Sequence, residues 1–257
     1  MISIDRLCYQ SKLRYENAQS KFLYAMLTLV VCLLCRSIAI SVVALAVNHI
    51  MTVKKGGVPA RQYLHFMTIP LVFLLLSSIA IVINLGSAPM DLFAIPIGHL
   101  YLTGSRDSLF YALQLVLTSL SAVSSLYFLS MTTPMPDILN VLRQLHCPKL
   151  LIELMLLIYR YIFILLETAH AIRISQHSRL GYRNYRLSLK SFGMLGSALM
   201  IRAVNRSKAL YDAMEARCYD GTIQVLNETI PPRKGTLLKI IMFECLLLLI
   251  AVGGRLI

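Results

Sequence analysis

Long apolar runs alternate with short polar segments along most of this chain. The first run covers residues 22–53 and is interrupted only by Arg36 and Ser37 near its middle. It is longer than the roughly 20 residues that one membrane-spanning helix needs, and basic residues flank both of its ends, at Lys21 and Lys54. Because positive charge favours the cytoplasmic side, we expect two closely joined helices here, with both ends inside and Arg36 near the far tip. One long tilted helix is the alternative.

Three further runs predict single spans, at residues 66–85, 109–131 and 237–252. Prolines and glycines interrupt the stretch between the first two of these spans. Residues 86–107 are therefore expected to form a connection on the outer side with a short, partly inserted element. With the N-terminus inside, five crossings place the C-terminus outside. The pattern predicts an all-α, polytopic membrane protein with about five transmembrane helices.

The segment that follows the run at 109–131 changes character. Pro134 and Pro136 predict the end of one helix and the start of another, and a short amphipathic helix is expected over residues 137–146. Residues 149–167 are apolar but contain charged side chains. Since a charge at the bilayer centre costs roughly 2.5–3.5 kcal/mol, a helix at the membrane surface is favoured. A further full crossing stays open.

Residues 167–220 are strongly basic and lack an uninterrupted apolar run of the roughly 18 residues that a span requires. We expect this segment to be helical, to lie on the cytoplasmic side, and to split near Gly193 or Gly196 into two basic helices. The predicted organisation is an N-terminal transmembrane region (1–131), a cytoplasmic or membrane-surface coupling region (132–235) and a C-terminal transmembrane helix (236–257).

Composition agrees with a membrane protein. Of the 257 residues, 57% are hydrophobic and 14% are charged, whereas soluble proteins carry roughly 25% charged residues. The formal net charge is +13, which in a multi-spanning protein mostly reflects the cytoplasmic loops. Nucleic-acid binding is the weaker interpretation of this charge, because the chain is so apolar.

No set of side chains predicts catalysis or a metal centre. The chain has no Gly-x-x-x-x-Gly-Lys-Ser/Thr loop, so it is not expected to hydrolyse ATP. Cys32-x-x-Cys35 lies in an apolar run without other ligands, which favours packing residues over a redox pair. His170 and His177 share a helix face, but the third and fourth ligands of a structural site are not provided.

Two acids inside apolar runs, Glu153 and Glu244, leave a second class of function open. Intramembrane acids serve proton-coupled and ion-coupled carriers. Partners such as Arg160 or Lys239 would instead make these acids members of structural pairs.

Small residues form two matching stripes, each of which ends in an arginine. Ala171, Ser175 and Ser178 precede Arg179, and residues at these spacings lie on one helix face. Small side chains let two helices approach closely, so that both arginines would emerge near one crossing if the helices cross at the stripes. The second stripe repeats the spacing with Ala209, Ala213, Ala216 and Arg217.

A guanidinium carries five donors in a fixed fork, which suits carboxylates and the carbonyl groups at helix ends. An exposed arginine on a rigid helix pair therefore favours docking to a protein partner. Contact with anionic lipid headgroups is the alternative. The supporting basic residues of the same segment are Arg173, Arg183, Arg186, Arg202 and Arg206.

At these residues the chain resembles the transmembrane T component (CbiQ/EcfT family) of energy-coupling-factor ABC importers of the cobalt type. The first stripe is similar to the family's Ala-Arg-Gly motif, although Leu180 stands between Arg179 and Gly181. Cys218 stands where a glycine is usual after the second arginine. The second coupling motif is resembled by Arg206-Ser207, Tyr211, Ala213-Met214, Ala216-Arg217 and Tyr219-Asp220-Gly221.

The resemblance implies a non-catalytic coupling subunit. It would bind two cytoplasmic ABC ATPase subunits, which carry the ATP, and a separate substrate-binding S component, with a further small membrane subunit as an option. It implies cobalt or nickel transport in a bacterial inner membrane, with no cofactor, metal ion or nucleic acid on this chain. A stand-alone ion-coupled carrier and a lipid-binding scaffold are the alternatives. The implied ATPase-docking residues are Ala171, Ser175, Ser178, Arg179, Gly181, Ala209, Ala213, Ala216 and Arg217.

Overall fold

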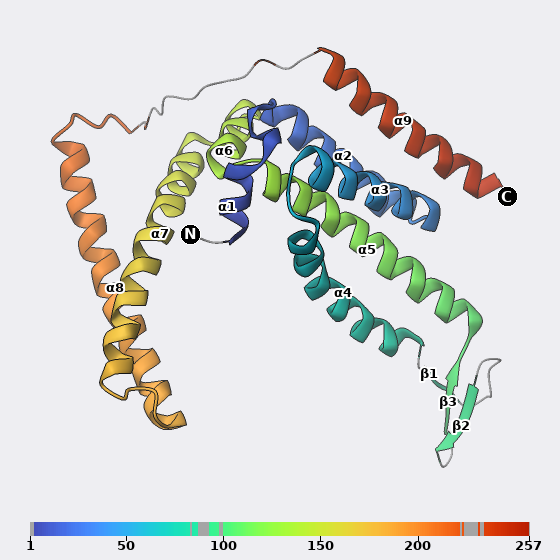
Figure 1. Cartoon of the computed structure of the whole chain (residues 1–257), viewed down its shortest axis with the longest axis horizontal. Coiled ribbons are helices and arrows are strands. Elements are labelled where there is room, and N and C mark those ends of the chain that lie inside the picture. The colour runs from blue at the N-terminus through green and yellow to red at the C-terminus, as the bar shows by residue number, and fades with distance from the viewer. Residues whose placement is uncertain are drawn as a thin grey trace. The chain divides into compact units, whose positions relative to one another are not determined.

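The computed structural model describes residues 3–82, 84–86, 93–97, 100–221, 223, 231 and 234–256. These residues divide into two compact units. One unit, here called the bundle unit, joins Ile2–Ile138 to Thr229–Ile257. The other, here called the hairpin unit, is Leu139–Glu228. Each is described by itself, with the element labels of Figure 1.

The bundle unit begins with two short helices, α1 (Ser3–Gln10) and η1 (Lys12–Tyr15), followed by α2 (Ala18–Cys35) and α3 (Ile38–Ile50). The Asn17 side chain caps α2 by accepting the Ser20 amide at 3.0 Å. Arg36 ends the helix with a left-handed backbone, φ 43°, which reverses the chain. Two joined helices with Arg36 at the tip were predicted for residues 22–53, and this prediction is confirmed.

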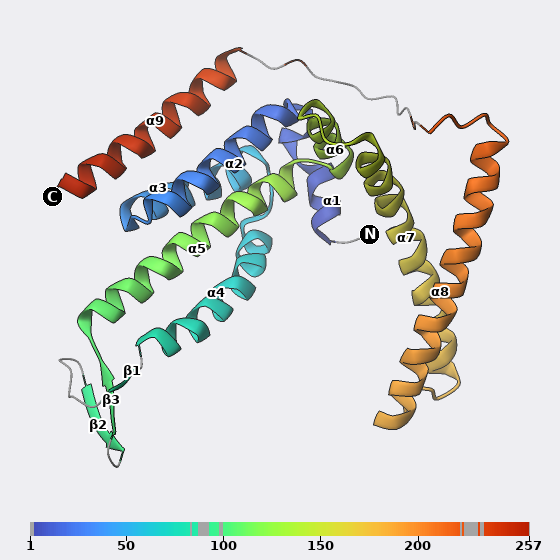
Figure 2. The same ribbon diagram turned by 180° about the vertical axis from the view of Figure 1, so that it is seen from behind.

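Helix α5 (Arg106–Thr132) lies at the centre of the bundle unit, against α2, α3 and α4 (Ala60–Val82), as seen from behind in Figure 2. Small hydroxyl side chains line its buried face and bond to each neighbour in turn. Ser124 pairs with the Tyr63 hydroxyl at 2.9 Å, and Ser125 accepts the Asn48 amide at 2.9 Å. Small residues permit close helix approach, and the bonds satisfy polar groups that would be costly to bury alone.

Cys32 lies in this same interface rather than in a redox or metal site. Its side chain is fully buried, and its sulfur lies 3.3 Å from the Ser121 hydroxyl of α5. Helix α9 (Lys234–Leu256) packs against α2, where Glu244 accepts the Thr28 hydroxyl at 2.7 Å. Lys239 had been considered as the partner of Glu244, and that assignment is wrong.

Five described helical segments are long and apolar enough to cross a membrane: Ala18–Cys35, Ile38–Lys55, Ala60–Val82, Arg106–Thr132 and Tyr185–Glu215. The first four coincide with predicted spans. The predicted last span forms α9 but is not among the five. The fifth segment lies within residues 167–220, which were expected to be cytoplasmic because they contain no uninterrupted apolar run of about 18 residues. An 18-residue window there reaches a mean hydropathy of 1.2 with at most two charged residues.

The chain between α4 and α5 forms three short strands, β1 (Asn84–Gly86), β2 (Phe93–Ile97) and β3 (Leu100–Gly104). They pair antiparallel in the order β1-β3-β2, with Leu102 opposite both Leu85 and Ile95. We had expected an irregular connection with an inserted element. The small sheet is an addition to an otherwise all-α, polytopic fold. Residues 87–92 and 98–99 of the predicted connection lie outside the described residues.

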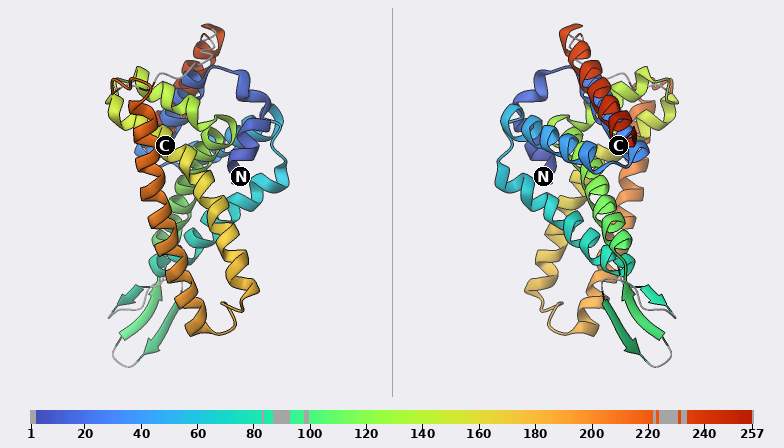
Figure 3. Two further views of the ribbon diagram at one scale, coloured as in Figure 1. Left: turned by 90° about the vertical axis from the view of Figure 1, so that its left-hand side faces the viewer. Right: turned by 90° about the vertical axis from the view of Figure 1, so that its right-hand side faces the viewer.

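The hairpin unit consists mainly of α7 (Lys149–Ser178) and α8 (Tyr185–Glu215), which run antiparallel on either side of a turn at residues 179–184 (Figure 3). The short amphipathic helix predicted before them is α6 (Met135–Gln144), which spans the boundary between the units. Residues 149–167 and the first stripe thus belong to one helix.

The predicted break near Gly193 or Gly196 is wrong, because both glycines lie inside α8. An added Cβ at either position would meet no atom within 4 Å, so neither glycine is required by a close contact. A glycine inside a helix costs only about 1 kcal/mol relative to alanine, which a 31-residue helix tolerates.

Candidate docking site

Helix α7 ends at Arg179 in a tight backbone cap. The Leu180 amide donates to the His177 carbonyl at 3.0 Å, and the Gly181 amide donates to the Gln176 carbonyl at 2.8 Å. Leu180 has φ 56°, in the left-handed region. This pattern of bonds is the Schellman motif, which satisfies carbonyl groups that the helix leaves without partners.

Helix α8, whose last residue is Glu215, is closed by the same pattern of bonds around Arg217. The Cys218 amide donates to the Glu215 carbonyl at 2.9 Å, and the Tyr219 amide donates to the Met214 carbonyl at 3.1 Å. Cys218 has φ 57°, within one degree of Leu180. The two arginines therefore occupy the same position of the same cap, one at the end of each helix.

The cap explains the backbone at Leu180 and Cys218, the residues that follow the two arginines. The position after each arginine adopts a left-handed backbone, which costs an L-residue roughly 1–2 kcal/mol and which glycine adopts freely. Glycine is the residue found most often at this position of helix caps in general. Leu180 and Cys218 occupy that position here and retain its geometry.

Both stripes are exposed, and they do not cross. All their members are solvent-accessible within the described structure, while Gly181 is half-buried. Because α7 and α8 are antiparallel, Arg179 lies at the turn and Arg217 at the opposite end of α8. At 1.5 Å per residue, the 31 residues of α8 span about 45 Å. The expectation that both arginines emerge near one crossing is wrong.

A compact network fixes the Arg179 end. The Gln176 amide donates to the Ser191 carbonyl at 2.9 Å and its oxygen accepts the Tyr182 hydroxyl at 2.7 Å. The Ser191 hydroxyl, 1% exposed, donates to the Gly181 carbonyl at 2.7 Å. A Cβ on Gly181 would lie 2.8 Å from both the Gln176 carbonyl oxygen and the Ser191 hydroxyl. Gly181 is required here because no side chain fits.

A single buried carboxylate fixes the Arg217 end. Glu153, in the first turns of α7, is 6% exposed. Its two oxygens accept the Tyr219 hydroxyl at 2.9 Å and the Ile223 amide at 3.0 Å. The bond to the carboxylate raises the pKa of the Tyr219 hydroxyl above its usual range. Arg160 had been considered as the partner of Glu153, and this interpretation is wrong.

The supporting arginines divide between the two ends. Arg183 and Arg186 lie in and just after the turn, on the side of Arg179, whereas Arg202 and Arg206 lie in the second half of α8. Arg173 lies in the last third of α7. All five are exposed.

A groove of about 760 Å³ lies between the middle of α7 and the second half of α8. Its α7 wall is apolar, whereas its α8 wall includes the polar residues Arg202, Asn205 and Arg206. Leu154 and Ile158, on the α7 side, are about half exposed. The α7 wall comprises Leu154, Leu157, Ile158, Tyr161, Ile164, Leu165 and Thr168.

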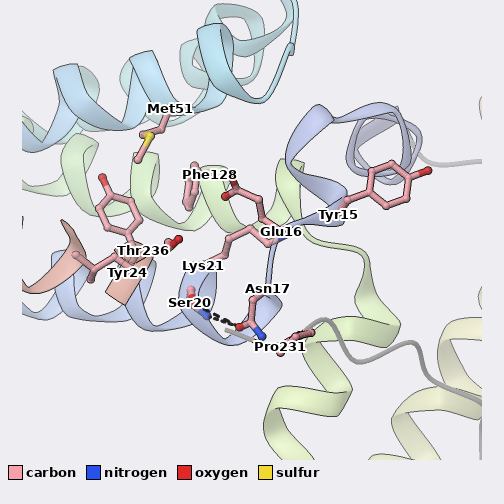
Figure 4. A pocket seen from close by; sticks show the side chains of 11 residues that line it. Tyr15, Glu16, Asn17, Ser20, Lys21, Tyr24, Met51, Phe128, Pro231 and Thr236 are labelled. Atoms are coloured by element: carbon pink, nitrogen blue, oxygen red, sulfur yellow. Dashed lines mark hydrogen bonds between the residues drawn. The ribbon is translucent and has the colours of Figure 1, made fainter. Parts of the chain in front are cut away.

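The bundle unit has a separate pocket of about 320 Å³, shown in Figure 4 with the Asn17–Ser20 cap among its lining residues. Lys21, 4% exposed, lies in its wall and donates to the Leu13 and Thr132 carbonyls at 2.9 and 3.0 Å. From the sequence, Lys21 is expected only to flank the first apolar run as a basic residue. In the fold it ties α2 to η1 and to the end of α5.

No group of three or more potential metal ligands of the His, Cys, Asp or Glu type comes together in the part of the chain that the structure describes. The site therefore consists of two exposed arginines on matched helix caps, with different supports. This arrangement suits recognition of acidic or carbonyl-lined surfaces.

Comparison with known proteins gives consistent matches. The CbiQ family, described as cobalt transport protein, matches residues 10–228. An uncharacterized protein of Methanocaldococcus jannaschii is 32% identical over 96% of this chain and 92% of its own length. The cobalt transport protein CbiQ of Salmonella typhimurium is 29% identical over 86% of this chain and 98% of its own length.

A third relative is a putative fused cobalt transport protein, CbiMQ, of Methanocorpusculum labreanum. It is 37% identical over 66% of this chain, which corresponds to 28% of the fused protein. The matching segment is therefore one part of a longer chain in that relative.

Proposed function

The chain belongs to the CbiQ family of cobalt transport proteins, and we propose that it is the transmembrane coupling subunit of an energy-coupling-factor importer for cobalt or nickel ions. In this role the chain hydrolyses no ATP and carries no substrate. It binds two cytoplasmic ATPase subunits and transmits their movement to a membrane partner that holds the metal ion.

One observation carries the proposal: α7 and α8 end in the same cap, and each cap presents an exposed arginine after an exposed stripe of small residues. A stripe of small residues lets a partner helix approach closely. The cap fixes the backbone beside the guanidinium, so that little conformational freedom is lost on docking. The two ends are suited to insertion into acidic or carbonyl-lined grooves.

The separation of the two arginines favours two partners over one. About 45 Å of helix lies between Arg179 and Arg217, which is more than one small docking groove covers. One ATPase subunit at each end accounts for both motifs. A movement of the two ATPases relative to each other would then act on the two ends of one rigid hairpin.

The membrane partner would hold the cation. The apolar wall of the α7–α8 groove gives this unit a surface for a membrane helix. The fused relative named CbiMQ supports close association with another membrane component, because fusion keeps two parts together.

The experiment is co-purification of the chain with candidate ATPase subunits. Replacing both docking arginines, Arg179→Glu with Arg217→Glu, should abolish the complex and ATP-dependent metal uptake. Arg143→Glu, an exposed charge reversal on α6, is the matched control and should leave both intact. Unchanged ATPase binding in the double variant would refute the docking role.

Two further measurements separate the rival functions. A lipid-binding scaffold needs charge alone, so Arg179→Lys with Arg217→Lys should then have no effect; docking through the guanidinium fork predicts a clear loss. A stand-alone carrier would move metal ions in vesicles without ATP or partners, whereas the coupling subunit should not.

A further inference from the structure

Glu153 is a buried acid whose two hydrogen bonds within the described residues lead to the segment beyond α8. The side chain is 6% exposed, and a buried carboxylate is costly unless both of its oxygens are hydrogen-bonded. Both are: one accepts the Tyr219 hydroxyl and the other the Ile223 amide. The chain thus places a charged acceptor on α7 and two donors beyond α8, 66 and 70 residues away.

Tyr219 connects this carboxylate directly to the cap of Arg217. Its backbone amide closes the cap on the Met214 carbonyl at 3.1 Å, while its hydroxyl is held by Glu153. Arg217 lies two residues before Tyr219, inside the backbone loop that the bond between Tyr219 and Met214 closes. The chain that carries the guanidinium is therefore fixed to α8 through the backbone and to α7 through one side chain.

We propose that Glu153 is the positioning residue of Arg217, which holds the exit of α8 against α7 so that the guanidinium meets its ATPase partner in one orientation. This inference rests on the proposed function. It extends the site by a residue 64 positions upstream of the arginine that it orients, on the other helix of the hairpin.

The effect is confined to one end of the hairpin. The Arg179 cap is supported by Gln176, Tyr182 and Ser191, and none of these bonds within the described residues involves Glu153. Loss of the carboxylate should therefore weaken the docking of the partner at Arg217 and leave the partner at Arg179 in place.

The first test needs no partner. A nitroxide is attached to exposed Cys218, next to Arg217, in a variant whose other five cysteines are replaced, and its mobility is measured by electron paramagnetic resonance. Tyr219→Phe, which removes one hydroxyl, and Glu153→Ala should both sharpen the spectrum. Tyr185→Phe, at a tyrosine that is 84% exposed, is the matched control. Unchanged spectra in both Tyr219→Phe and Glu153→Ala would overturn the proposal.

The second test measures affinity for the ATPase subunits in the full complex. Glu153→Ala should weaken binding by roughly tenfold, the size expected when a charge-assisted hydrogen bond that orders the site is lost. Glu153→Gln keeps one acceptor oxygen and should fall between Glu153→Ala and the wild type. A purely structural role predicts that Glu153→Gln and Glu153→Ala lower the melting temperature of the protein but leave its affinity for the ATPase subunits unchanged. That result would contradict the proposal.

A double-mutant cycle separates this inference from the proposed function. If Glu153 acts through Arg217, Glu153→Ala has no further effect on affinity in the Arg217→Ala background but a full effect in the Arg179→Ala background. Equal effects in both backgrounds would refute the positioning role while docking stands. A third result is also informative. If Arg217→Ala and Arg179→Ala leave ATPase binding unchanged, while Glu153→Ala still increases the mobility of the nitroxide on Cys218, the docking function fails and the anchoring by Glu153 remains.

Discussion

The two arginine-bearing ends of the hairpin unit share one backbone geometry but differ in what supports it. At the Arg179 end every supporting bond closes within 15 residues, among Gln176, Tyr182 and Ser191. At the Arg217 end the support comes from Glu153, 66 residues before Tyr219. The same local motif is therefore held once by residues close in sequence, on both sides of the turn, and once by a residue far away in sequence, Glu153. A repeated motif specifies the shape of the cap, whereas its stability depends on the surroundings.

The largest expected effect breaks the Arg179 end alone. Gly181→Val introduces a Cβ 2.8 Å from the Gln176 carbonyl and the Ser191 hydroxyl, and a backbone oxygen cannot move away as a flexible side chain can. We expect a loss of about 3 kcal/mol in local stability. Hydrogen exchange should show faster opening of residues 176–191 and unchanged protection at 214–221. Equal loosening at both ends would mean that the supports are not independent.

A smaller effect of the same kind is expected from Ser191→Ala. The substitution leaves the Gly181 carbonyl without the hydroxyl that lies 2.7 Å away, in a site where Ser191 is 1% exposed. A buried acceptor without its partner costs about 1–2 kcal/mol. Ser197→Ala, on the exposed face of the same helix, is the matched control. If both variants exchange at the same rate around the turn, the Ser191 bond contributes nothing to the cap.

The contrast between the ends also shows which parts of the molecule the sequence could predict. The break at Arg36 follows from charge and spacing within a few residues, and these local signals were sufficient. The end of α7 was misplaced by more than ten residues because Gly193 and Gly196 resemble a break, whereas Leu180 does not. A leucine in a left-handed cap gives no local signal, since its conformation is imposed by the bonds to Gln176 and His177.

The support of Arg217 could not be predicted for a different reason. Glu153 lies in an apolar stretch, and only the antiparallel pairing of α7 and α8 brings it to Tyr219. The preference of a carboxylate for a cation suggested Arg160, but the two oxygens of Glu153 accept hydrogen bonds from a phenol and a backbone amide instead. Long-range pairing of this kind depends on tertiary structure, which residue spacing does not specify.

Replacing the residue after either arginine by glycine should stabilise the cap. Cys218→Gly and Leu180→Gly remove a side chain from a backbone with φ near 57°, and we expect a gain of about 0.5–1 kcal/mol at each end. Ala198→Gly, within α8, should instead destabilise the helix by about 1 kcal/mol. The test is that the two kinds of glycine substitution change stability in opposite directions. Protection of the amides near each position against hydrogen exchange measures this change. A loss of protection at Cys218→Gly would mean that its side chain stabilises the cap.

The smallest expected effect depends on the thiol that one cap carries next to its arginine and the other cap lacks. Cys218 is exposed beside Arg217, whereas Leu180 beside Arg179 has no reactive group. A hydrophilic maleimide should therefore modify Cys218 and weaken docking at that end only, by steric obstruction next to the guanidinium. Cys8 provides the internal reference. Burial raises the pKa of its thiol to about 11.

Because a raised pKa favours the neutral thiol, only about one Cys8 thiol in a thousand is ionised at pH 8. The reactive fraction grows as the pH approaches 11, so Cys8 should stay unmodified at pH 8 while Cys218 reacts. Mass spectrometry of the labelled peptides measures both thiols in one sample, and Cys218→Ser should remove the effect on ATPase binding. Equal loss of binding in the labelled Cys218→Ser variant would place the sensitive thiol elsewhere and leave the two caps chemically equivalent.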